Sequence, residues 1–147
     1  MPWATYRLTA VAHRRLIALL AAVPLVAGCG GGSAKKSVTL ELTGATGNQN
    51  FTACAKQAAF FLYNGPAQVR FTGTVKPAPD GRWKVKVKIK QCSAGKFVDV
   101  TSQKLVGQSS GRYDGAIPIA EKGYYYARAQ LEGGAKPRSQ KEYFRIG

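Results

Sequence analysis

In Arg82-Trp-Lys-Val-Lys-Val-Lys-Ile-Lys90 the apolar and basic residues alternate without a break, and this is the clearest structural pattern in the sequence. In a β-strand successive side chains point to opposite faces, so this sequence buries one face and leaves the other in water. A helix would mix the two kinds of side chain around its surface. The segment therefore predicts a strand with a buried apolar face and an exposed basic face.

The same period of two recurs along the rest of the chain from residue 38 onward. We expect further strands at 38–43, 67–75, 97–100, 104–106, 111–119, 124–131 and 142–146. A loop is expected at 44–50 and turns at 64–66 and 77–81, whereas 51–63 fits either a short helix or a strand. Short strands separated by turns in roughly 110 residues predict an all-β, antiparallel sandwich of about seven to nine strands.

The amino-terminal residues have the pattern of a secretion signal. Three arginines, Arg7, Arg14 and Arg15, precede an apolar run at 16–27 that is short for a membrane span. The run ends in Val26-Ala-Gly-Cys29, which resembles the lipobox of bacterial lipoproteins. In that family the cysteine receives diacylglycerol and becomes the mature amino terminus.

This resemblance divides the chain into a signal peptide, with its signal helix, at 1–28, a flexible Gly/Ser/Lys tether at 29–37 and a folded domain at 38–147. It implies lipidation of Cys29 and an extracytoplasmic location, anchored to the bacterial cell membrane. Two other interpretations stay open. The signal is cleaved in the ordinary way with Cys29 incidental, or it remains as an uncleaved anchor.

Two cysteines are left once Cys29 is assigned to the lipid. Cys54 and Cys92 are exported together, and exported thiols usually pair. We therefore expect a disulfide between them, with two buried free cysteines as the alternative. Their spacing is not the C-x-x-C of a thiol oxidoreductase.

The residue types argue against catalysis. The only histidine, His13, lies in the predicted signal peptide, so the mature chain has no imidazole for a catalytic triad or for most zinc sites. Seven acidic residues are spread along the chain in no recognisable pair. We expect no enzymatic activity, no cofactor and no metal.

The charge balance points to anionic partners. The chain has 22 Lys and Arg against 7 Asp and Glu, a net charge of +15. Removing residues 1–28 takes away three arginines and no acid, which leaves +12 on the mature chain. Such a charge predicts attraction to polyanions and says nothing about fold.

A second resemblance appears towards the carboxyl end. Glu121-Lys-Gly-Tyr-Tyr-Tyr-Ala127 resembles the D-x-G-x-Y-x-C motif that opens strand F of immunoglobulin-superfamily domains, and the stretch from Val69 to the last strand is similar to Ig-like modules of bacterial surface proteins. The resemblance implies an Ig-like sandwich in which Tyr125 forms the tyrosine corner, with a buried ring and a hydroxyl bonded to backbone. Ala127 replaces the cysteine of the motif, so the inter-sheet disulfide of antibody domains is absent.

The resemblance also implies that the strands at 82–90, 124–131 and 142–146 lie side by side in one sheet. Alternation then points one set of side chains inward: Val85, Val87, Ile89, Tyr125, Ala127, Ala129, Leu131, Phe144 and Ile146. The opposite set forms a candidate ligand face of cations and tyrosines: Lys84, Lys86, Lys88, Lys90, Tyr124, Tyr126, Arg128, Tyr143 and Arg145, flanked by Arg82 and Lys141.

These observations predict a membrane-anchored extracytoplasmic binding or adhesion module. Its partners would be the membrane, through the lipid, and an anionic cell-wall polymer, anionic lipid or envelope protein, through the basic-aromatic face. Nucleic acid is not expected as the physiological partner, because the predicted compartment holds little of it. Two alternatives stay open: a structural accessory domain of an envelope complex, and a basic face that only keeps the sheet soluble.

Overall fold

The computed structural model describes residues 34–147, which contain ten β-strands and no helix. The strands are β1 (Ser37–Val38), β2 (Glu41–Thr43), β3 (Gly47–Ala53), β4 (Lys56–Tyr63), β5 (Ala67–Lys76), β6 (Lys84–Ser93), β7 (Lys96–Val106), β8 (Arg112–Ile119), β9 (Gly123–Leu131) and β10 (Glu142–Ile146). The predicted all-β class is confirmed. The predicted signal peptide and Cys29 lie outside the described residues.

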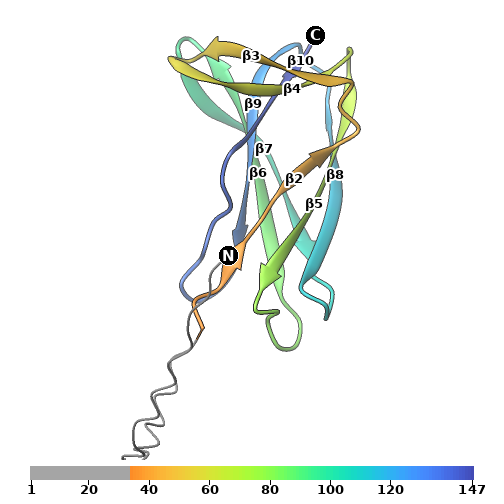
Figure 1. The fold of residues 1–147 in the computed structure, drawn as a ribbon, viewed down its shortest axis with the longest axis vertical. Coiled ribbons are helices and arrows are strands. Elements are labelled where there is room, and N and C mark those ends of the chain that lie inside the picture. The colour runs from red at the N-terminus through yellow and green to blue at the C-terminus, as the bar shows by residue number, and fades with distance from the viewer. Residues whose placement is uncertain (1–33) are drawn as a thin grey trace, which may run out of the picture. The chain divides into compact units, whose positions relative to one another are not determined.

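The strands form the two sheets of a sandwich (Figure 1). In the smaller sheet β5 pairs with β8 and with β1 and β2. The larger sheet has the order β3-β4-β10-β9-β6-β7, so β6, β9 and β10 are neighbours as expected from the Ig-like arrangement. Every pairing is antiparallel except that of β4 with β10, which is parallel.

The core lies between the two sheets and is built from the inward residues of both. All nine positions predicted to point inward are at most 5 % exposed. They meet Val69, Phe71, Val75 and Tyr113 of the smaller sheet in the same cluster. The alternation of the sequence therefore sets which face of each central strand is buried.

Buried tyrosines of the core donate hydrogen bonds to nearby backbone carbonyls. Tyr125 is 1 % exposed, stacks on Phe144 with ring centroids 5.1 Å apart, and donates its hydroxyl to the Glu121 carbonyl at 2.8 Å. This is the hydrogen bond expected of a tyrosine corner. Tyr63 donates to the Thr43 carbonyl in the same way, at 2.9 Å.

The segment 44–63 differs from the prediction. β3 begins at Gly47, inside the expected loop, and residues 51–63 are strand on both sides of a tight turn. The turn is formed by Cys54 and Ala55, with φ of 48° and 57°. These positive values are the ones a two-residue hairpin turn requires, but the residues are not the Asn-Gly pair that usually marks such a turn.

Three boundaries also differ. The strands expected at 97–100 and 104–106 are one strand, β7, which bends at a register shift beside Ile89 and Lys90 of β6. β6 itself runs from Lys84 to Ser93 rather than from residue 82 to 90. β1 begins at Ser37, within the predicted tether. The count rises to ten because of the β3–β4 hairpin and the division of the first strand.

The expected disulfide is present. Cys54 and Cys92 are joined with an S–S distance of 2.01 Å across a sequence separation of 38. The bond ties the turn of the β3–β4 hairpin to the end of β6. Because β10 and β9 lie between β4 and β6 in the sheet order, the hairpin has to bend towards β6 for the two cysteine Cα atoms to lie 5.7 Å apart.

Candidate functional site

The candidate site is the outer face of the six-stranded sheet, on the side away from the core. β6, β9 and β10 carry its side chains, and the ladder places Lys88 opposite Arg128 and Lys90 opposite Tyr126. Arg145 of β10 lies opposite Tyr124 of β9. The face has two regions, one aromatic and one basic.

The aromatic region, which we name the aromatic cap, lies beside the disulfide. Its members are Phe51, Phe60, Phe97, Tyr124, Tyr126 and Tyr143, which come from five strands. In a flat sheet the strands of Phe51 and Tyr124, three positions apart, would be separated by about 14 Å. Their ring centroids are 5.5 Å apart, so the sheet curls over itself at this end.

The cap is a small second core rather than an exposed binding surface. Phe60 is fully buried and Tyr126 is 8 % exposed, while Tyr124 and Tyr143 are half-buried. Neighbouring rings meet edge-on or tilted, with centroids 4.9 to 6.1 Å apart. The prediction that Tyr126 is exposed is wrong, because Phe97 and Tyr143 cover its ring.

Two cations of the predicted face belong to this cap. The Arg145 guanidinium lies over the rings of Phe51 and Tyr124, at 5.3 and 5.7 Å from their centroids. The Lys141 ammonium lies 4.7 Å from the centroid of Tyr126. These contacts attract cations to the ring faces, so both charges already have a partner within the fold.

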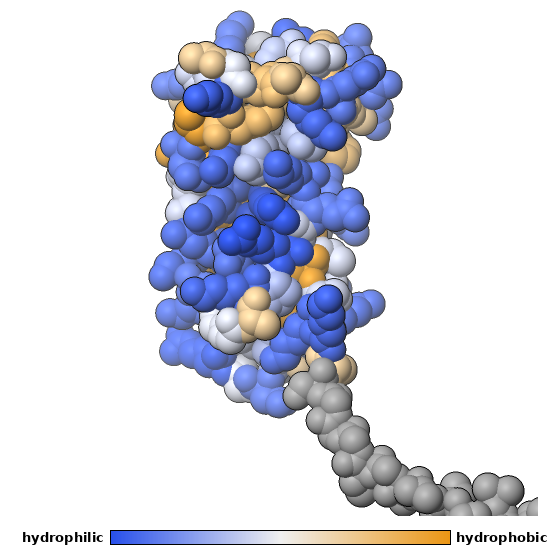
Figure 2. All heavy atoms as spheres, turned by 90° about the vertical axis from the view of Figure 1, so that its left-hand side faces the viewer, coloured by the Kyte–Doolittle hydropathy of each residue, from blue (hydrophilic) through white to orange (hydrophobic). Residues whose placement is uncertain are grey.

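The second region, which we name the basic groove, is open. Its cations are Lys86, Lys88, Lys90, Arg128, Lys136 and Arg138, and Gln130, Tyr126 and Glu132 also line it. A hollow of about 160 Å³ adjoins a wider one of about 530 Å³, since Lys88 and Gln130 border both. Figure 2 shows one side of the molecule that is hydrophilic through its middle and apolar near the end formed by β3 and β4.

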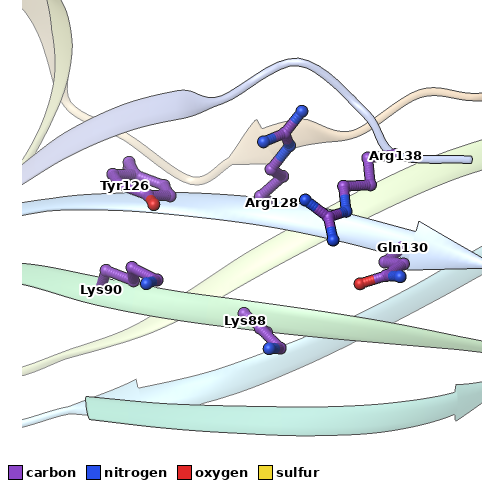
Figure 3. Close-up of a pocket in the computed structure, with 6 residues that line it drawn as sticks. All are labelled: Lys88, Lys90, Tyr126, Arg128, Gln130 and Arg138. Atoms are coloured by element: carbon purple, nitrogen blue, oxygen red, sulfur yellow. The ribbon is translucent and has the colours of Figure 1, made fainter. Parts of the chain in front are cut away.

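Arg128 is held in place by the backbone. Its Nε donates to the Ser139 carbonyl at 3.0 Å. Ser139 is 3 % exposed, and its hydroxyl accepts from the Ala129 N–H and donates to the Gln140 carbonyl. Arg138 reaches over β9 beside Arg128 and Gln130, and Lys88 and Lys90 extend from the neighbouring strand (Figure 3). Cations from three segments of the chain thus converge on one hollow.

The groove has an excess of unpaired positive charge. Within residues 34–147 two ion pairs form, Lys90 with Asp99 at 3.4 Å and Lys104 with Glu132 at 3.2 Å. The other five groove cations have no carboxylate partner in this described part of the chain. The ladder also sets Lys88 opposite Arg128 and Lys86 opposite Lys104. Like charges directly opposite each other destabilise a sheet.

The structure sorts the predicted face residues into these regions. Lys86, Lys88, Lys90 and Arg128 line the groove, whereas the three tyrosines and Arg145 belong to the cap, with Tyr126 bordering both. Lys84 is exposed at the start of β6 and lines neither region.

Three groove residues were missed by sequence reasoning. Gln130 was overlooked because it is uncharged, and Lys136 and Arg138 lie between β9 and β10, in a segment with no strand alternation. The one signal in the sequence is the Lys-Pro-Arg stretch at 136–138, which places two cations close together.

Burial raises the pKa of the Tyr143 hydroxyl, the neighbouring Tyr126 raises it further, and Arg128 partly offsets both. The raised pKa keeps the Tyr143 hydroxyl neutral at physiological pH, so this side chain adds no charge to the face. In the core, burial raises the pKa of Tyr63 to about 12.

Residues 34–147 contain no group of three or more His, Cys, Asp or Glu side chains placed to hold a metal ion. No helix in that range is long and apolar enough to cross a membrane. The chain matches no protein-family model, and no curated protein is significantly similar to it in sequence.

Proposed function

We propose that the chain is a lipid-anchored extracytoplasmic domain of a bacterial membrane that binds an anionic envelope polymer through the basic groove. The anchor is supported by the signal pattern and by the lipobox-like sequence ending at Cys29. The disulfide between Cys54 and Cys92 agrees with an oxidising compartment.

One observation carries the binding proposal: cations without carboxylate partners converge on a single hollow. Lys88 and Arg128 face each other across the ladder, and Arg138 reaches the same hollow. Such an arrangement costs stability in the free domain. A bound anion would relieve the repulsion, and departures from local stability rules are expected at functional sites.

The shape of the groove fits a linear ligand with repeated charges. Lys86, Lys88 and Lys90 share one face of β6, so their Cα atoms stand about 6.5–7 Å apart in a row. Arg128 and Arg138 form a second row beside them. A polymer that carries phosphate or carboxylate groups would contact both rows at once.

Binding is favoured over catalysis by the residue types present. Outside the predicted signal peptide the chain has no histidine. The smaller hollow of the groove is lined by lysines, arginines, Gln130 and Tyr126, and the one acid that borders the wider hollow, Glu132, pairs with Lys104. Such a site holds anions but lacks a neutral base near pH 7. Specific recognition without a reaction is the function that this chemistry supports.

The test uses the chain from residue 29 with Cys29→Ser, titrated with poly(glycerol phosphate) and with uncharged dextran. We expect binding to the polyanion alone, weakening as salt rises. The combined variant Lys86→Gln, Lys88→Gln, Arg128→Gln should bind at least about tenfold more weakly.

The matched control removes the same charge elsewhere. Lys56, Arg70 and Arg112 are exposed and lie outside the groove, so their combined change to glutamine should affect binding little. Equal weakening by the two triple variants would mean that only net charge matters, and the groove would lose its role.

The anchor has a separate test. Cells that express the full chain should incorporate a fatty-acid analogue into it, and Cys29→Ala should abolish the label. Label that persists in this variant would contradict the lipid assignment.

A second candidate function is favoured by the edge of the larger sheet. β7 is the terminal strand, and its Val98, Val100 and Val106 are 44 %, 44 % and 53 % exposed. An open edge with exposed valines suits docking to an envelope protein. If Val98→Lys with Val100→Lys abolishes crosslinking to such a protein, and the groove variant changes neither crosslinking nor polymer binding, the docking function replaces the first.

A further inference from the structure

An apolar pocket lies at the end of the sandwich opposite the aromatic cap, where the described chain begins. Pro79, Trp83, Leu131, Ala135 and Pro137 form its apolar walls, and its volume is about 490 Å³. It adjoins the basic groove across Glu132 and Gly133 but shares none of the groove's cations. Its chemistry is therefore that of a separate site.

One wall of the apolar pocket is rigid. Trp83 is 6 % exposed and meets Tyr113 edge-on, with ring centroids 6.5 Å apart. A side chain at Gly107 would overlap the indole, so the ring lies flat against the backbone there. Leu131, at the end of β9, is 5 % exposed. Another part of the wall is formed by the exposed residues Gly133, Gly134 and Ala135, of which Ala135 contributes an apolar side chain.

The rim of the pocket is basic and close in sequence to the proposed anchor. Lys35 and Lys36 are exposed at the rim, and Ala34 beside them follows Cys29 by five residues. Five residues span at most about 18 Å when fully extended. A lipid on Cys29 would therefore keep this end of the domain at the membrane surface, where an anionic leaflet attracts lysines.

We propose that the apolar pocket takes up an acyl chain of an anionic membrane phospholipid, whose headgroup phosphate contacts Lys35 and Lys36. The proposal rests on the lipid-anchored location in the proposed function and not on polymer binding by the groove. Apolar walls beneath a pair of cations match an amphiphile with a negative head. A sugar-phosphate polymer has no apolar part to fill such walls.

The fluorescence of Trp83 can report on contact with the acyl chain. Trp83 is the only tryptophan after residue 28, so fluorescence of the chain from residue 29 with Cys29→Ser comes from the pocket wall. The probe is a vesicle of phosphatidylglycerol with bromine on its acyl chains, which quenches tryptophan on contact. We expect quenching by these vesicles and much less by brominated phosphatidylcholine vesicles.

Two alanine variants locate the contact. Ala135→Asp places a charge in the pocket at an exposed position, and should lower vesicle affinity about tenfold, or ~1.4 kcal/mol, and remove the quenching. Ala120→Asp places the same charge at an exposed position next to the far end of β8 and should change neither. Thermal unfolding of both variants shows that the fold is kept.

The outcomes separate this proposal from the proposed function. Vesicle binding without quenching of Trp83, or equal effects of the two aspartates, would overturn the acyl-chain site. The variant Lys86→Gln, Lys88→Gln, Arg128→Gln should lose polymer binding and keep the quenching. If the groove variant lost both, the vesicles would be bound by the groove and the pocket proposal would fail.

Discussion

The aromatic cap and the basic groove lie on the same face of the larger sheet and share strand β9, yet one is closed and the other open. The cap residues come from β3, β4, β7, β9 and β10, and the groove residues come from β6, β9 and the connection between β9 and β10. Over the cap the β3–β4 hairpin folds back, fixed by the disulfide to β6. Among residues 34–147 no such segment lies over Lys86 and Lys88, which stay half-exposed.

Strand alternation and burial by other segments are therefore independent of each other. A period of two predicts which side chains leave the main core. It does not say whether another segment then buries them. Aromatic residues gain from being covered, because burial removes large apolar surfaces from water, whereas lysines lose their hydration. The β3–β4 hairpin covers the rings of the cap, whereas the cations of the groove stay partly or fully exposed to water.

Removing the disulfide that holds the hairpin over the cap should change stability the most. Replacing Cys54 and Cys92 by alanine should lower the free energy of unfolding by about 4 kcal/mol in the chain-entropy description, given the sequence separation of 38. Urea unfolding of the double variant and its parent measures this.

The same double variant should keep its groove. Polymer affinity is expected to change little at temperatures where the variant is folded, because Arg128 is held by Ser139 and not by the hairpin. A parallel loss of stability and affinity would show that the two regions act as one.

The next largest change in stability is expected when a buried ring is removed from the cap. Phe60 is fully buried against Phe51, Tyr124 and Tyr143, so Phe60→Ala should cost about 3 kcal/mol through lost burial and a cavity. Denaturant titration gives the change. A cost below about 1 kcal/mol, the range of surface substitutions, would argue that the cap is not a core.

Changes in the groove should have a smaller effect of opposite sign, an increase in stability. Lys86→Gln with Lys88→Gln removes one member of each like-charge pair across the ladder, and should raise stability by about 0.5 kcal/mol at low salt. The gain should shrink at high salt, because salt screens the repulsion between exposed charges. A loss of stability at low salt would contradict the account of groove repulsion.

The smallest effect is expected at Glu142, whose side chain lies on the other side of β10 from Tyr143, outside both regions. Burial, and secondly the charge of Glu41, raise the pKa of Glu142. The charged carboxylate is therefore disfavoured in the folded state at neutral pH, and Glu142→Gln should stabilise by about 0.3 kcal/mol there. The gain should vanish below the ordinary pKa of 4.5, where both states are protonated. Urea unfolding at neutral and acidic pH tests the sign.

The central strands were predictable because their sequence satisfies a simple physical rule. Val85, Val87 and Ile89 alternate with lysines, and every one of them is buried. The tyrosine corner was predictable from a short local motif around Tyr125. The β3–β4 hairpin was not, because Cys54 and Ala55 take positive φ values that their residue types seldom adopt and that no local pattern signals.

The candidate site was predictable only in part for the same reason. Lys86, Lys88, Lys90 and Arg128 follow from strand alternation. Arg138 belongs to the connection between β9 and β10, which has no strand alternation, yet it lines the groove. The rings of Tyr124, Tyr126 and Tyr143 are covered by residues distant in sequence, namely Phe51, Phe60 and Phe97. Contacts of this kind depend on how the sheet curls, which single-strand patterns do not encode.

The parallel pairing of β4 with β10 has a consequence for how the domain is made. β10 is the last strand in the sequence, yet it sits between β4 and β9 inside the larger sheet. When the chain is synthesised from its amino end, the β3–β4 hairpin has no neighbouring strand until residues 142–146, which form β10, have been made. Assembly of this sheet is thus a late event that depends on long-range contacts, which makes folding slow.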